Sequence, residues 1–143
     1  MLTDTIKFNL DSFEKDLQEW QRRFKQDPKD RWFVHYTIMS EKIKEKAKIN
    51  ILPTIHTLQD LKYTYGEKYK VKDIEYHLEA ALNACEVIRK TLREIYDLYK
   101  IQKEYETIRM SWQAHFPTLF KRINNVRERV YILDRILVNE EEL

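Results

Sequence analysis

Turn-forming and cross-linking residues are scarce in this sequence, which has one glycine, three prolines and one cysteine among 143 residues. Glycine and proline supply most tight turns, so their scarcity argues against an all-β fold and favours a few long helices with short connections. The single cysteine, Cys85, cannot form an intramolecular disulfide, and we expect it to be a buried thiol. The predicted class is all-α.

Long apolar runs are also missing. No stretch approaches the roughly 18 consecutive apolar residues that a membrane span requires. The N-terminal segment carries acidic residues and no continuous apolar run, so we do not expect a secretory signal there. These absences predict a cytoplasmic protein that does not enter a membrane.

The composition is that of amphipathic helices. Hydrophobic residues make up 43% of the chain and charged residues 35%, which is too apolar for a disordered chain. The net charge of +2 gives no overall attraction to polyanions, so only local patches could bind them. Because no linker-like segment divides the 143 residues, we predict a single domain.

The strongest helical pattern covers about residues 73–113. Asp73 is suited to cap its N-terminus, and neither glycine nor proline follows for about 40 residues. Apolar or small residues recur at spacings of three and four, which places them on one stripe of a helix. These residues are Ile74, Leu78, Ala81, Cys85, Ile88, Leu92, Ile95 and Tyr99. The pattern predicts a long central helix of about 60 Å.

Two helices precede this one and are predicted to form a hairpin. The first covers about residues 3–25, and the second begins at Pro28, since proline fits the first position of a helix. Pro53 predicts a kink in the second helix, and Gly66 signals its end. The alternation in KYTYGEKYKVK leaves open a small β-hairpin around Gly66.

A corner at Pro117 is predicted to precede the final helix. The lengths then indicate an elongated antiparallel bundle of four to five helices, in which two short helices cover only one end of two long ones. About residues 53–89 would project as a helical arm. Its exposed apolar residues predict a homodimer in which two arms form a second four-helix cluster, unless Pro53 bends the segment back onto the bundle. The interface would comprise Ile55, Leu58, Leu61, Ile74, Leu78 and Leu82.

The best binding candidate in the sequence is residues 62–72, where lysines alternate with tyrosines. Such a segment combines charge suited to phosphate with rings that can stack on bases. The alternative is a solvated loop whose tyrosines cover the end of the arm. The predicted partner-binding residues are Tyr63, Tyr65, Lys68, Tyr69, Lys70 and Lys72.

The histidines do not form a metal-binding pattern. None of the four lies three or four residues from another or in a Glu-x-x-His spacing, which would place two ligands on one helical face. We therefore predict no metal and no cofactor.

One short segment resembles a catalytic element. Arg109 and His115 frame RMSWQAH, which is similar to the Arg-x(4–6)-His element of HEPN ribonucleases, a family of small all-α proteins. The resemblance implies that His115 would act as acid or base while Arg109 binds phosphate. Met110 stands where that family usually has a polar residue.

Amphipathic stripes dominate the sequence, and no larger catalytic pattern accompanies them. We therefore predict a non-catalytic helical-bundle protein that acts through protein contacts, as an adaptor, assembly subunit or inhibitor. The alternative is a nucleic-acid-binding protein that uses residues 62–72, or a HEPN-like ribonuclease that uses Arg109 and His115.

Overall fold

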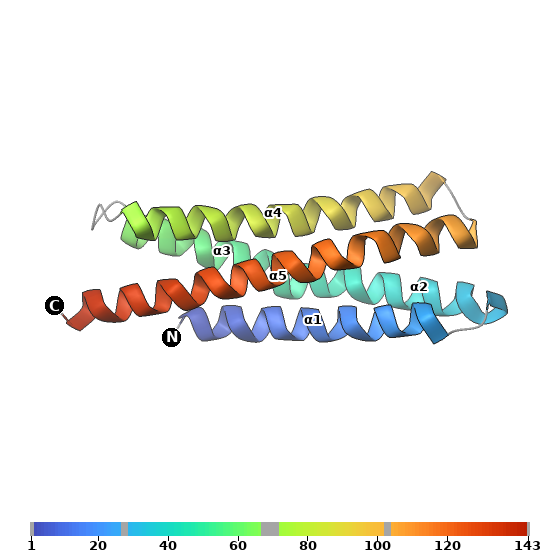
Figure 1. The fold of residues 1–143 in the computed structure, drawn as a ribbon, viewed down its shortest axis with the longest axis horizontal. Coiled ribbons are helices and arrows are strands. Elements are labelled where there is room, and N and C mark those ends of the chain that lie inside the picture. The colour runs from blue at the N-terminus through green and yellow to red at the C-terminus, as the bar shows by residue number, and fades with distance from the viewer. Residues whose placement is uncertain (1, 27–28, 67–71, 102–103, 143) are drawn as a thin grey trace.

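The computed structural model describes residues 2–26, 29–66, 72–101 and 104–142, and almost all of them are helical (Figure 1). No strand occurs within these ranges, which confirms the predicted all-α class. The elements are α1 (Leu2–Gln26), α2 (Lys29–Lys46), the π-helical segment η1 (Ala47–Ile51), α3 (Leu52–Leu61), the π-helical segment η2 (Lys62–Gly66), α4 (Lys72–Ile101) and α5 (Tyr105–Glu142).

The helices form an elongated antiparallel bundle, as the sequence predicts. Four helical lines run along its length: α1, the line formed by α2, η1 and α3, then α4, and finally α5 (Figure 1). Helix α4 packs against α5 and α3, while α1 packs against α5, α2 and η1. Both chain ends lie at the same end of the bundle.

The predicted long helix over residues 73–113 is wrong at its C-terminal end. Helix α4 stops at Ile101, and α5 begins at Tyr105 and runs back along it. No glycine or proline marks this reversal, so no stop signal is present in the sequence there. Continuation to residue 113 would have carried Ile108 and Trp112 beyond the bundle, whereas the reversal buries both.

The predicted corner at Pro117 is also wrong, because this proline lies inside α5. Proline removes one backbone N–H and leaves the carbonyl four residues earlier without its usual donor. That carbonyl belongs to Gln113, and both Gln113 and Pro117 are exposed, so water can satisfy it. Burial of the neighbouring Phe116 and Leu119 stabilises the helix through this position.

Pro53 does interrupt regular α-helical geometry, but the chain continues as a helix. The residues before it form η1, in which the Leu52 N–H bonds to the Ala47 carbonyl five residues earlier. A π-turn of this kind lets the helix continue although Pro53 has no backbone N–H to donate. The Thr54 hydroxyl also donates to the carbonyl of Asn50 at 2.6 Å, inside the core.

The alternative β-hairpin around Gly66 is not supported on its N-terminal side. Residues 62–66 form the helical segment η2. Residues 67–71 lie outside the part of the chain that the structure describes.

The projecting arm over residues 53–89 is not present, because α3 and the N-terminal half of α4 pack within the bundle. Five of the six predicted interface residues are buried in the single chain: Ile55, Leu58, Leu61, Ile74 and Leu78. Leu82 is partly buried against the same core. These side chains do not form an exposed face, so the reason for expecting the dimer is removed. The alternative, in which the segment folds back onto the bundle, describes the structure.

An aromatic cluster fills the core near the turn between α4 and α5. Trp112 lies with its ring centroid 5.8 Å from that of Trp20 and 5.5 Å from that of Phe116. Phe24 contacts Trp20 at 4.3 Å between centroids, and Tyr36 from α2 lies 5.8 Å from Trp20. Such tilted and edge contacts add to the burial of large apolar areas, so this cluster fixes α1, α2 and α5 together.

Candidate functional site

A groove of about 310 Å³ lies between the line of α2, η1 and α3 on one side and α4 on the other. It is lined by Lys44, Ala47, Lys48, Leu52, Arg89, Leu92, Arg93, Tyr96 and Asp97. The volume is at the lower limit for small-ligand sites in proteins. We call this site the basic groove.

The floor of the basic groove is apolar. Leu92 is buried, and Ala47 and Tyr96 pack against the core, while Leu52 is half-buried. The Tyr96 hydroxyl donates to the Ser40 carbonyl at 3.4 Å, which links α4 to α2. Burial raises the pKa of Tyr96, so its hydroxyl stays neutral and the floor carries no charge of its own.

The two sides of the basic groove carry cations at matched spacing. Lys44 and Lys48 are four residues apart on one side, and Arg89 and Arg93 are four apart on α4. A spacing of four places both members of each pair on the same helical face. Among the described residues that line the groove, Asp97 supplies the only carboxylate.

Most of these cations have no ion-pair partner within the described part of the chain. Arg89 lies 3.3 Å from the Glu86 carboxylate on its own helix. Among the residues that the structure describes, Lys44, Lys48 and Arg93 have no ion-pair partner. The groove therefore combines apolar surface with positive charge that remains available to a ligand.

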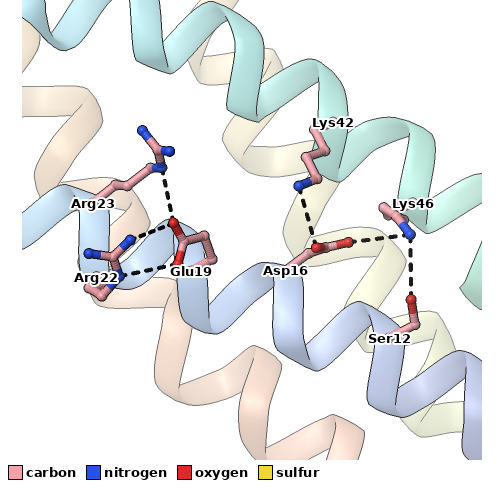
Figure 2. A network of polar contacts seen from close by, with 7 residues as sticks. All are labelled: Ser12, Asp16, Glu19, Arg22, Arg23, Lys42 and Lys46. Atoms are coloured by element: carbon pink, nitrogen blue, oxygen red, sulfur yellow. Dashed lines mark hydrogen bonds and ion pairs between the residues drawn. The ribbon is translucent and has the colours of Figure 1, made fainter.

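The lysines of α2 and η1 lie on two different faces of this helical line, one toward α1 and one toward the basic groove. Lys42 and Lys46 turn toward α1, where their ammonium groups each lie 3.6 Å from the carboxylate of Asp16 (Figure 2). Residues two apart lie on opposite sides of a helix, so Lys44 and Lys48 turn away from α1 toward the basic groove. The first pair stabilises the bundle, and the second pair lines the basic groove.

A second hollow, of about 470 Å³, lies beside this ion-pair network. Beside it, Glu19 accepts from Arg22 at 2.6 Å and from Arg23 at 3.3 Å (Figure 2). The Arg22 hydrogen bond holds the pKa of the Glu19 carboxyl below its usual value. Two of its three lining cations, Arg22 and Lys42, already pair with carboxylates of α1, so this hollow offers less to an anionic ligand than the basic groove.

The predicted binding segment over residues 62–72 is described only in part. The Lys62 ammonium bonds to the Glu79 carboxylate on α4, and the Tyr63 side chain is 85% exposed. Tyr65 lies in η2 and Lys72 begins α4, but their side chains, and all of Lys68, Tyr69 and Lys70, lie outside the described part. A role for residues 62–72 in partner binding therefore stays a prediction.

The HEPN-like pair lies on one helix. Arg109 donates to the Tyr105 hydroxyl at 3.4 Å, and His115 is half-buried further along α5. Six helical residues correspond to a rise of about 9 Å and a rotation of about 240°, so the two side chains leave the helix in different directions. The fold of α5 therefore does not bring Arg109 and His115 together on one face.

A different histidine does meet an arginine. His77 on α4 has its Nδ1 atom 2.9 Å from Nη1 of Arg129 on α5, and the guanidinium lies 5.1 Å from the centre of the Tyr76 ring. Burial, reinforced by the Arg129 charge, lowers the pKa of His77. A neutral imidazole can accept from Arg129, so this contact joins α4 to α5.

Two features are absent from the described residues. Among the described residues, no group of three or more histidine, cysteine or acidic side chains is placed to hold a metal ion. Within the same residues, no helix is both long and apolar enough to cross a membrane.

Sequence reasoning did not identify the basic groove. A signal was present, because Lys44 and Lys48 share the spacing of Arg89 and Arg93. Cations at this spacing are common on solvated helix faces, and only the packing of η1 beside α4 shows that the two pairs face one groove. Comparison with protein-family models, curated proteins and solved structures finds no match to this chain.

Proposed function

We propose that this chain is a non-catalytic helical-bundle protein that acts through protein–protein contacts, as an adaptor, an assembly subunit or an inhibitor. The observation that supports this function best is the basic groove, in which an apolar floor lies between two cationic sides. Grooves of this composition suit side chains of a partner protein, because apolar contacts provide affinity and charges fix the orientation.

The composition of the groove favours a protein over a nucleic acid. Sites for single-stranded nucleic acid commonly present aromatic faces on which bases can stack. In the basic groove the aromatic residue is Tyr96, which packs against the core and whose hydroxyl bonds to Ser40. Leu52 and Leu92 complete a floor that suits aliphatic side chains.

Affinity capture from source cells tests the proposed function. The full chain, tagged and bound to resin, is incubated with lysate that has or has not been treated with nuclease. We expect a defined protein partner that is retained after nuclease treatment. Capture of nucleic acid alone, or loss of every captured protein on nuclease treatment, would contradict the proposal.

An enzymatic control accompanies this experiment. The Arg109→Ala, His115→Ala variant should capture the same partner as the original chain, because neither residue lines the basic groove. RNA cleavage by the original chain that disappears in this variant, with thermal stability unchanged, would favour the ribonuclease alternative.

A further inference from the structure

We infer that the basic groove receives an acidic amphipathic helix of a partner protein, with its apolar stripe on the groove floor and its carboxylates toward both sides. The inference rests on the proposed function and specifies the chemistry of the partner.

The floor requires apolar side chains at helical spacing. Ala47 and Leu52 lie on one side of it and Leu92 on the other, so the apolar surface follows the direction of the flanking helices. An amphipathic helix presents residues i, i+3 or i+4, and i+7 along one stripe, which is the usual way in which a helix enters a groove between two others.

The sides require carboxylates on both flanks of that stripe. Lys44 and Lys48 stand on one side, and Arg89 and Arg93 on the other, with each pair separated by one helical turn. Glutamates or aspartates four residues apart on the partner helix match this repeat. Arginine can pair with carboxylates through two parallel hydrogen bonds, so the α4 side would fix the orientation of the helix.

Charge complementarity selects this occupant over others. A basic helix would bring like charges against the four cations, and a purely apolar helix would leave Lys44, Lys48 and Arg93 without partners. A nucleic acid would supply phosphate anions but no apolar side chains to contact Leu52 and Leu92 on the floor. An acidic amphipathic helix satisfies both parts of the groove.

The test uses a designed peptide and the full chain. The probe is a fluorescein-labelled helical peptide of about 16 residues with leucines at i, i+4, i+7 and i+11 and glutamates flanking that stripe. Fluorescence anisotropy should show saturable binding that weakens as salt is raised. Peptides with the glutamates changed to lysine, or the leucines to serine, should each bind at least about tenfold more weakly.

Matched protein variants locate the site. Lys48→Glu with Arg93→Glu reverses one charge on each side of the groove at exposed positions, and we expect at least about a tenfold loss of affinity. Lys90→Glu with Lys121→Glu makes the same change in net charge at exposed positions outside the groove lining, and should alter affinity by less than about twofold. Circular dichroism checks that both variants stay helical.

Three results would overturn the inference. These are equal affinity for the glutamate and lysine peptides, equal loss of affinity in the two protein variants, and stronger competition by a single-stranded oligonucleotide or a fatty acid than by unlabelled probe.

Capture of the natural partner distinguishes a failure of this inference from a failure of the proposed function. If Lys48→Glu with Arg93→Glu still captures a nuclease-resistant protein partner undiminished, the function stands and the groove assignment fails.

Discussion

Leu58 provides the sharpest test of the fold, because its predicted role and its observed role differ. An arm interface would place it between two chains, whereas the structure buries it completely inside one chain, in the helix that packs against α1 and α4. Replacing a buried leucine by alanine removes its transfer free energy and leaves a cavity, at a cost of about 2–5 kcal/mol. With a denaturant slope of about 2 kcal/mol per molar, Leu58→Ala should lower the urea midpoint by roughly 1–2.5 M.

The assay is urea unfolding followed by circular dichroism, repeated over a tenfold range of protein concentration. A single-chain core predicts a midpoint that does not depend on concentration. A dimer that unfolds to separate chains would gain about 1.4 kcal/mol per tenfold increase, or roughly 0.7 M in midpoint. Ile38→Ala is the matched control, because Ile38 is 61% exposed and its loss should change stability by less than about 0.5 kcal/mol. A concentration-dependent midpoint, or a cost below about 1 kcal/mol for Leu58→Ala, would refute the reasoning.

Three further predictions concern ionisable groups. Burial raises the pKa of the Cys85 thiol to about 12, so iodoacetamide should react with it slowly near neutral pH until urea unfolds the chain; rapid reaction of the folded protein would show an accessible thiolate. The pKa of His77 is lower in the folded chain than its unfolded value near 6.5. Neutral His77 therefore contributes stability above about pH 6.5, and this stability is lost as the pH falls through the folded pKa. The free energy of unfolding should therefore drop less between about pH 7.5 and about pH 5.5 in His77→Gln than in the original chain, and an equal drop would contradict the assignment. The hydrogen bond from Lys7 to Asp134, at 2.8 Å, raises the pKa of Lys7, so their coupling should be fully present below about pH 10.5 and lost as the pH rises through the folded value. A double-mutant cycle of Lys7→Met and Asp134→Asn at neutral and alkaline pH measures that coupling, and a coupling that persists above the folded pKa would disprove it.

The groove shows why sites made by packing are hard to find in a sequence. Lys42, Lys44, Lys46 and Lys48 form one regular series, yet two of them pair with Asp16 and the other two line the groove. Their helical spacing separates the two sets, but it does not say which neighbour each set faces. That choice depends on the position of η1 between α1 and α4.

The sequence by itself determined the helical class and the residues of the core. The spacing of Ile74, Leu78 and Ala81 in α4 predicted side chains that are all buried. Such stripes follow from local geometry, because a helix repeats every 3.6 residues whatever it packs against.

Only the tertiary structure decided where the chain reverses and which faces meet. The turn after Ile101 has neither glycine nor proline. Pro117, at which the sequence predicts a corner, lies inside α5. Local preferences for stopping a helix amount to about 3 kcal/mol or less, whereas burying Trp112, Phe116 and their neighbours contributes several times as much in total. The same burial places Leu58 and Leu78 in one core with α1 and α5, since a long-range gain of this size outweighs the local signals.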